Sequence, residues 1–554
     1  MAGPGRRIVF GAACFLALAG LASAQWNTTG SDAQRTSWVR TDPNISVASM
    51  QKPGFQFLWK VKANNEARAG ISLSQAIELP RYIGYRGFRA YAFFAGSSNN
   101  LIALDSDLGR LEWSRNIPIP IPQATSTCPG GMTAGVSRPA ALAVGAGGGG
   151  RGGGGGAAGA SGGGRGGRGA VSAVGQPGQG AVQIAAQAAG GGGRGGRGGR
   201  GASGGAAGAS GGRGGGGGGG GRGGAIGTND LFALTSDGMV HVVYVSTGED
   251  AMAPIRFLPA NAKASGLIFT ESDVFVSTSG NCGGVPNGVW ALDLTSSDKA
   301  VSSWKSNGGS VVGTAFSADG TVFATTADGD YSPASFSDAV VSLEGKGLKM
   351  KDYFTPAKSE FTTAPVLFTW QGKEVVAAAN KDGKIYLLDA ASLGGADHRT
   401  PLAQSSAFGG ITTGSLATWE DDGTRWILAP VAGGLNSATR FAGTNGNVTN
   451  GAVAAFKVVD QGGKPSLQPA WVSRDLLIPQ TPAIVNGVVF AVSGGDAQHP
   501  AVLYALDGST GKDLWNSGTT MTSFARAGIS GGASQLYLGT NDSTIYAFGF
   551  PLVK

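Results

Sequence analysis

The chain is poor in cysteine and histidine, and both shortages limit its chemistry. It has three cysteines and three histidines in 554 residues. No CxxC or CxxCH motif is present, which excludes a thiol redox pair and an attached c-type haem. His241, His398 and His499 lack metal-ligand spacing, so we interpret each as a turn or surface residue. A GxxxxGK[ST] phosphate loop is also absent.

Long hydrophobic runs are missing as well. The longest, residues 8–21, is shorter than the roughly 20 residues that a transmembrane helix needs. It follows Arg6 and Arg7 and ends at an Ala-Ser-Ala sequence, which is the layout of a cleavable signal peptide. We therefore expect residues 1–24 to be removed and the mature chain to begin at Gln25. The protein is then periplasmic or secreted, without a transmembrane anchor.

Acidic and large apolar residues are scarce in one tract, residues 143–224, which holds most of the excess among the 99 glycines. Such a segment cannot bury a core, so we predict that it is disordered. It carries eight arginines and no acidic residue, and the signal peptide carries two more arginines. When the charges of these ten arginines are subtracted from the total of +7, the rest of the chain has a net charge of −3. The basic pI is a property of the tract, and export excludes nucleic acid as its partner. Adhesion to anionic surface polymers is the alternative to a passive insertion.

The cysteines form an even pair once the signal peptide has been removed. Cys14 leaves with that segment, and Cys128 and Cys282 remain. Extracytoplasmic compartments favour disulfides. We predict one disulfide between Cys128 and Cys282.

A repeated unit organises the rest of the chain. LYALDGSTGKDLW, residues 503–515, recurs at residues 101–113 and 289–304 and in part at 385–395. Each copy reads as a strand, a turn and a strand: alternating apolar residues make the strands, Asp and Gly make the turn, and the Trp can pack between neighbouring units. Repeats of this length indicate the blades of a β-propeller.

The count of units predicts an all-β, eight-bladed propeller of four-stranded antiparallel blades over residues 55–554, after an N-terminal extension at 25–54. The last segment, 521–548, has only three strands, and the strand at 55–62 can complete it, so that the chain ends close the ring and remove exposed sheet edges. Seven blades is the alternative. Seven complete patterns are found, the second interrupted by the Gly/Arg-rich tract: 70–116, 133–247, 262–304, 310–354, 360–405, 410–473 and 479–516.

At these residues the chain resembles the pyrroloquinoline quinone (PQQ) repeat superfamily. Residues 505–515 nearly repeat its Ala-x-Asp-x-x-x-Gly-x-x-x-Trp motif, and residues 26–38 resemble the segment that leads into such propellers. The superfamily includes PQQ-dependent alcohol dehydrogenases and non-enzymatic scaffolds. The fold does not choose between them.

The resemblance implies where a quinone and Ca²⁺ would bind, and several positions depart from it. Ser279 and Gly280 match a Ser-Gly-x-Glu loop whose calcium-binding Glu is here Cys282. A vicinal cysteine pair followed by an Arg has become Cys128 alone before Arg138. These two departures together imply that the predicted disulfide crosses the former site and ties the second blade to the third.

Other implied positions are mixed. The Trp that stacks on the quinone aligns with Val312, and the calcium-binding Asn aligns with Asp328, which retains an oxygen ligand. Glu360 lies near the position of the catalytic Asp, and Lys381 matches a basic residue that contacts the quinone. A strand-start carboxylate and a turn lysine are the alternative interpretations of these last two.

Two functions follow. The first is a binding or scaffold propeller with a degenerate cofactor site, whose partner is an envelope protein or polysaccharide. The second is a PQQ- and Ca²⁺-dependent dehydrogenase acting on alcohols or sugars, with Glu360 as its base, Arg138, Ser279, Gly280 and Lys381 around the quinone, and Asp328 on the metal. The sequence leaves open whether the protein is an enzyme.

Overall fold

The computed structural model describes residues 26–84, 87–142, 227, 229–356 and 359–551. The expected signal peptide and Gly/Arg-rich tract lie outside these residues. The described part is built almost entirely of strands. Its helical segments are α1 (Val47–Met50) and the 3-10 turns η1 (Cys282–Gly284) and η2 (Gly395–Asp397). Across the described ranges, no helix has the length and apolar character needed to cross a membrane.

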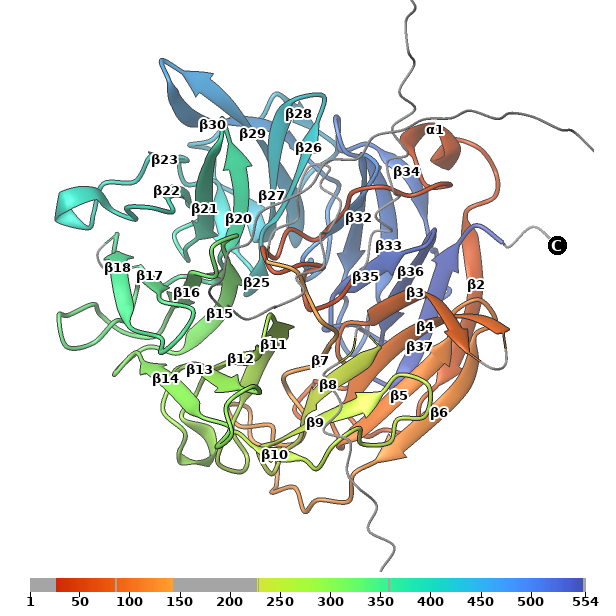
Figure 1. The fold of residues 1–554 in the computed structure, drawn as a ribbon. Coiled ribbons are helices and arrows are strands. Elements are labelled where there is room, and N and C mark those ends of the chain that lie inside the picture. The colour runs from red at the N-terminus through yellow and green to blue at the C-terminus, as the bar shows by residue number, and fades with distance from the viewer. Residues whose placement is uncertain (1–25, 85–86, 143–226, 228, 357–358, 552–554) are drawn as a thin grey trace, which may run out of the picture. The chain divides into compact units, whose positions relative to one another are not determined.

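The first four blades are antiparallel four-stranded sheets whose strands pair in chain order (Figure 1). Blade 1 contains β3 (Ile77–Gly84), β4 (Gly87–Gly96), β5 (Asn100–Asp105) and β6 (Arg110–Asn116); blade 2 contains β7 (Val136–Ser137), β8 (Asp230–Leu234), β9 (Met239–Tyr244) and β10 (Ile255–Arg256); blade 3 contains β11 (Ala264–Thr270), β12 (Asp273–Thr278), β13 (Gly288–Asp293) and β14 (Val301–Lys305); blade 4 contains β15 (Val311–Phe316), β16 (Val322–Thr326), β17 (Val340–Leu343) and β18 (Met350–Phe354).

The next three blades are less uniform. Blade 6 has six strands, and blade 7 gains a fifth from the N-terminal segment. Blade 5 contains β20 (Val366–Trp370), β21 (Lys373–Ala379), β22 (Ile385–Asp389) and β23 (Ala403–Gln404); blade 6 contains β24 (Gly409–Ile411), β26 (Ala417–Asp421), β27 (Thr424–Leu435), β28 (Gly443–Thr444), β29 (Gly451–Gln461) and β30 (Lys464–Val472); blade 7 contains β1 (Trp38–Val39), β31 (Ala483–Val485), β32 (Val488–Ser493), β33 (Val502–Asp507) and β34 (Asp513–Asn516); β19 (Thr363–Ala364) and β25 (Gly414–Ser415) form a separate parallel pair.

Blade 8 combines the two ends of the described chain. It contains β35 (Ile529–Gly532), β36 (Gln535–Gly539) and β37 (Thr544–Gly549), and β2 (Gln56–Lys62) adds to β37 as the outer strand. In Figure 1 the red-orange β2 lies beside the blue β37. The predicted eight-bladed ring and its closure are therefore confirmed.

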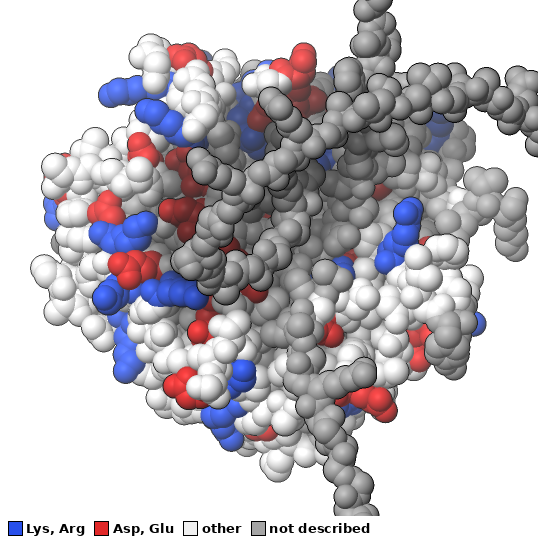
Figure 2. Space-filling view, in the orientation of Figure 1, with Lys and Arg blue, Asp and Glu red and all other residues white. Residues whose placement is uncertain are grey.

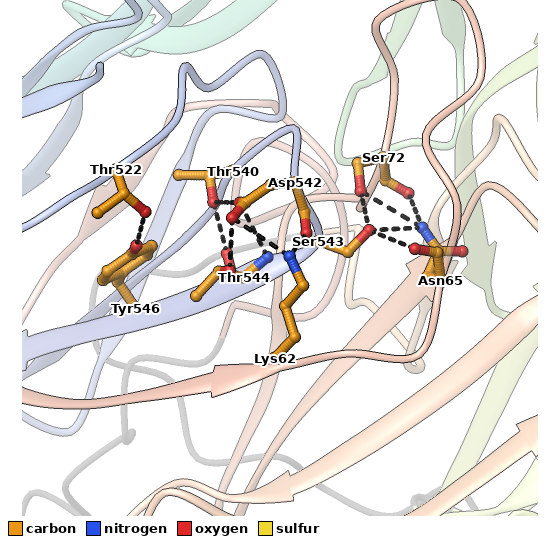
Figure 3. Close-up of polar contacts among 9 residues, drawn as sticks. All are labelled: Lys62, Asn65, Ser72, Thr522, Thr540, Asp542, Ser543, Thr544 and Tyr546. Atoms are coloured by element: carbon orange, nitrogen blue, oxygen red, sulfur yellow. Dashed lines mark hydrogen bonds and ion pairs between the residues drawn. The ribbon is translucent and has the colours of Figure 1, made fainter.

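Side chains reinforce this closure beyond the paired backbones (Figure 3). Lys62 Nζ forms an ion pair with Asp542 at 3.2 Å. Ser543 Oγ donates to the Asn65 carbonyl at 2.8 Å and lies 2.6 Å from Ser72 Oγ. Thr540 Oγ1 donates to Asp542 at 2.6 Å and orients its carboxylate. The turn before β37 thus holds the segment that enters blade 1.

The tryptophans of the repeat dock one blade onto the next, as predicted. Trp113 on β6 donates its indole N–H to the Val245 carbonyl of blade 2 at 2.9 Å. Trp59 on β2 donates to Ser106 of blade 1 at 2.9 Å, and Trp471 on β30 donates to Gly508 of blade 7 at 2.8 Å. Each indole lies against a turn glycine, at a position where an added Cβ would overlap the ring. Trp59 covers Gly109, Trp113 covers Gly248, and Trp471 covers Gly511.

Blade 2 differs from the sequence-based boundaries. Its outer strand β10 ends at Arg256, beyond the expected limit of residue 247. The outer edge first pairs through a bridge between Val243 and Asp250 and resumes only at Ile255. Pro254 stands between these pairings, and proline lacks the N–H that a continuous ladder requires. The proline therefore displaces the last strand along the chain.

The antiparallel order gives the propeller two distinct ends. Connections between the second and third strands of a blade, and between successive blades, lie at one end, which we call the upper end. Connections between the first and second strands, and between the third and fourth, lie at the lower end. β7 therefore ends, and β8 begins, at the lower end.

Residues 26–37 cross the axis of the propeller, a role that the sequence did not predict. Thr28 Oγ1 donates to Leu267 of blade 3 at 2.8 Å, and the Gln75 side chain links the Gly30 amide to Ile529 of blade 8. Backbone amides of six other blades donate to carbonyls of the segment, from Glu78, Arg138, Phe316, Leu367, Thr418 and Ile484 to Trp26, Asn27, Ala33, Gln34, Thr36 and Ser37, respectively, at 2.8–3.0 Å. The segment is thus anchored to every blade.

Candidate functional site

Three of the predicted site residues come together at the upper end, between blades 4 and 5. Lys381 Nζ lies 2.7 Å from Glu360 Oε1. The Asp328 backbone N–H donates to Glu360 Oε2 at 3.2 Å. The hydrogen bond from Lys381 is the main cause that lowers the pKa of Glu360. Glu360 is therefore held as a carboxylate, the form that a general base or a cation ligand requires.

A fourth residue, the acidic Asp338, belongs to this group, and the sequence did not predict it. Its side chain is 2% exposed, and its Oδ1 has no hydrogen-bond partner. Burial, followed by repulsion from Glu360 and neighbouring aspartates, raises the pKa of Asp338 to about 6. No motif in the sequence points to Asp338, because the connections between strands bring it near Glu360.

The predicted disulfide between Cys128 and Cys282 is present, with the two Cα atoms 5.5 Å apart. Cys128 lies on the connection into blade 2 and Cys282 on the β12–β13 connection of blade 3, so the bond ties these blades at the upper end. Beside it, the Ser279 amide donates to Lys263 at 3.1 Å and the Gly280 amide donates to Ser310 Oγ at 3.3 Å. The loop that carries Ser279 and Gly280 is therefore held in place by hydrogen bonds within the protein.

Arg138 lies apart from this group, where the axial segment, residues 26–37, contacts blade 2. Its side chain is 4% exposed, and its guanidinium donates to the Glu78 carbonyl at 3.0 Å and to Asn27 Oδ1 at 3.3 Å. Burial lowers the pKa of Arg138 to about 10. In this structure Arg138 joins the axial segment to blade 1, whereas Glu360 and Lys381 join blades 4 and 5.

A cavity of about 220 Å³ lies on the propeller axis, above residues 26–37. A second cavity of about 230 Å³ adjoins it and shares Thr29, Gln75 and Arg526 among its lining residues. Val312, the residue aligned with the stacking Trp, lines the first cavity. Among the described residues, no carboxylate lines either cavity, and neither Glu360 nor Lys381 does so.

The floor of the axial cavity contains a buried cation, Arg35. Its side chain donates to the carbonyls of Thr314 at 2.9 Å and Gly266 at 2.7 Å, to Thr28 Oγ1 at 2.9 Å, and to the Thr29 carbonyl. Arg35 is 4% exposed, and burial lowers its pKa to about 10. The sequence displayed this arginine within WNTTGSDAQRTSW, but only the path of the segment places it on the axis.

The described part of the chain holds no group of three His, Cys, Asp or Glu side chains arranged to bind one metal ion. On the face drawn in Figure 2, acidic and basic side chains lie next to one another over the left part of the view. This mixed distribution agrees with the mildly acidic charge that the sequence leaves to the propeller.

The fold is similar to that of several quinoprotein dehydrogenases of known structure. The chain is similar to the quinohemoprotein alcohol dehydrogenase of Comamonas testosteroni (TM-score 0.53, 11% identity, 96% of this chain and 81% of that chain) and to one from Pseudomonas putida (0.53, 12%, 96% and 81%). It is also similar to a europium-containing methanol dehydrogenase (0.53, 11%, 95% and 98%). No protein-family model matches the chain, and no curated protein matches its sequence.

These likenesses confirm the quinoprotein-type propeller at the level of fold. At identities of 11–12% they carry no assignment of activity or of site residues. The function therefore has to be argued from this chain's own side chains.

Proposed function

We propose that the protein is an extracytoplasmic binding propeller, with a partner among envelope proteins or polysaccharides, and not a quinone-dependent dehydrogenase. The observation that carries this proposal is the disulfide between Cys128 and Cys282. Cys282 takes the place at which the resemblance implies a calcium-binding Glu, and a sulfur in a disulfide has no charge or lone-pair basicity to offer a hard cation such as Ca²⁺.

The other implied quinone contacts also fit poorly. Val312 supplies no aromatic face for stacking, and Arg138 contacts Glu78 and Asn27. Glu360 and Lys381 pair with each other and do not line the axial cavity. Because these residues are spread over separate contacts, they do not form one cradle for PQQ. We derive no catalytic step through the quinone.

The disulfide also supports the proposed location, because such bonds persist in oxidising compartments. We infer that the upper end supplies the binding surface, because the connections between successive blades, such as residues 117–135 and 517–528, lie there, and binding residues are commonly carried on loops that a rigid scaffold positions. N-terminal sequencing of the protein purified from the cell envelope or medium tests the location, and a start at Gln25 is expected.

The test of the function is retention of quinone. The purified chain is incubated with PQQ and Ca²⁺, desalted, and analysed by absorbance and by a dye-linked assay on several alcohols and sugars. We expect neither bound quinone nor turnover. Quinone retained at one equivalent would overturn the proposal.

A dehydrogenase is the second candidate, and the contact of Glu360 with Lys381 at 2.7 Å favours it, because it keeps a carboxylate ionised near the upper end. Under this alternative, Glu360→Gln abolishes dye reduction while quinone remains bound. Glu374→Gln, at a partly exposed lower-end carboxylate, is the matched control and leaves turnover unchanged.

A further inference from the structure

Two arginines line the axial cavity, and among the described residues neither forms a direct ion pair with a carboxylate, although Asp32 attracts Arg35 and Asp496 attracts Arg526 at longer range. Arg35 is 4% exposed, and all of its hydrogen bonds go to carbonyl or hydroxyl oxygens. The nearest carboxylate on its own segment, Asp32, accepts from Thr36 and pairs with Arg40 at 3.6 Å. Burying a charge that has no directly paired counter-ion is costly, so an anion hydrogen-bonded to this guanidinium would be favourable.

A second arginine stands in the wall of the same cavity. Arg526, on the connection into blade 8, donates to the carbonyls of Gly494 at 3.2 Å, Ala525 at 2.7 Å and Gly495 at 2.9 Å. Its guanidinium lies 4.7 Å from the ring centroid of Phe524. Among the described residues it forms no ion pair with a carboxylate. A guanidinium has five N–H groups, so these three hydrogen bonds leave some of its donors unused.

Two hydroxyls that line the cavity are without partners. Ser37 and Thr314 are each 1% exposed, and Ser37 Oγ and Thr314 Oγ1 have no hydrogen-bond partner among the described residues. A buried hydroxyl without a hydrogen bond costs about 1–3 kcal/mol. Both residues belong to elements that hold Arg35: Thr314 accepts from its Nε, and Ser37 is two positions away on the same segment. The floor therefore offers hydroxyl donors that no residue in the described part of the chain satisfies.

We propose that the axial cavity is a binding site for one compact oxyanion, a phosphate-type ion or a short-chain carboxylate, held by Arg35, Arg526 and the hydroxyls of Ser37 and Thr314. Planar guanidinium groups and hydroxyls match the oxygens of such anions and give charge-assisted hydrogen bonds. The cavity of about 220 Å³ is smaller than the roughly 300–1,000 Å³ typical of drug-sized ligands, so its size suits a compact anion.

Val312, one position of the quinone site that the resemblance implies, lines this cavity, but Glu360, Lys381 and the disulfide do not. The proposed anion is therefore held by a different set of residues. It also goes beyond the proposed envelope partner, which contacts the upper end from outside. The anion instead lies on the propeller axis, against residues 26–37, which are the segment that every blade anchors. Its binding would stabilise the position of that segment.

The experiment is isothermal titration of the full mature chain, in a low-chloride buffer, with phosphate, acetate and malonate as probes and acetamide as the neutral analogue of acetate. We expect saturable one-site binding of phosphate or a carboxylate and none of acetamide. Comparing the affinity for phosphate with the affinities for acetate and malonate shows which class of oxyanion the site binds. Chloride added at increasing concentration should compete.

Variants locate the site. Thr314→Val keeps the shape but removes an unpartnered hydroxyl, and we expect roughly threefold to tenfold weaker binding. Arg526→Gln removes one charge, and we expect a loss of roughly tenfold or more. Arg81→Gln, at an exposed arginine on β3, is the control and leaves affinity unchanged. Arg35→Gln is checked for folding by circular dichroism first, because this side chain joins four residues.

Three outcomes would refute the site: no oxyanion binds more tightly than roughly 10 mM, acetamide binds as well as acetate, or Thr314→Val and Arg526→Gln bind as the wild type does. Failure here is distinct from failure of the proposed function, since that test measures retained PQQ and this one uses no quinone.

Discussion

Removal of the Cys128–Cys282 disulfide should lower the stability of the propeller by an amount that follows from chain length. The bond joins positions 154 residues apart. In the chain-entropy model, closing a loop of that size lowers the entropy of the unfolded chain enough to stabilise the fold by about 5 kcal/mol. This figure is the largest effect to expect, because residual structure in the unfolded chain reduces it.

The corresponding change in melting temperature is small, because the molecule is large. Unfolding entropy is about 2.1 cal/mol/K per residue near 60 °C, so a structure of roughly 440 described residues loses about 5 °C in Tm for 5 kcal/mol. Scanning calorimetry of the wild type, with and without reductant, measures the shift at one fixed scan rate. The half-buried Cys128 gives the reductant access.

The Cys128→Ala/Cys282→Ala double variant is the control for side effects of the reductant. It should melt close to the reduced wild type and should not respond to reductant. Two titratable thiols in the native, unreduced protein would contradict the bond, and an unchanged Tm on full reduction would contradict the reasoning about loop closure.

Two further predictions concern packing and pH. Gly511→Ala forces a Cβ into the Trp471 indole, whereas Gly423→Ala has the same φ of +72° and nothing within 4 Å, so Gly511→Ala should cost at least about 1 kcal/mol more in chemical denaturation. Equal losses would show that the docking of Trp471 does not restrict this turn. For Asp338, the pKa is raised to about 6 in the folded state, so its favourable contribution to stability is complete below the unfolded pKa of about 3.8 and is lost as pH rises through about 6. Asp338→Asn should therefore raise Tm at pH 8 and change it little at pH 4, and a wild-type pH profile that the substitution leaves unchanged would refute the assignment.

The architecture was accessible from the sequence because its signals are local and repeated. Outer-strand tryptophans mark blades 1, 3, 6, 7 and 8, and the incomplete last unit together with the strand at 55–62 predicted the closure that β2 and β37 make. The cysteine count predicted the disulfide. The blade pattern depends on residues that lie close together in the sequence, and the disulfide depends on the even number of cysteines that remains after the signal peptide is removed.

The axial segment could not be predicted, because its contacts are mostly backbone hydrogen bonds that leave no pattern in side chains. Arg35 and Thr314 are 279 residues apart, and no motif links them. The same holds for Asp338, whose raised pKa depends on carboxylates from other connections. Blade 2 extended past its expected end because Pro254 interrupts the outer edge. Non-local placement was the missing information in each case.

The closing blade has a consequence for the time course of folding. Lys62 and Asp542 are 480 residues apart, and among the described strands β2 pairs with β37 alone. At about 5–20 residues per second of synthesis, roughly 25–100 s separate the appearance of these two strands. During that interval the ring stays open, and the edge of β2 is free to pair with other chains. A chaperone that shields residues 56–62 would therefore be needed for a shorter time in a host that elongates faster.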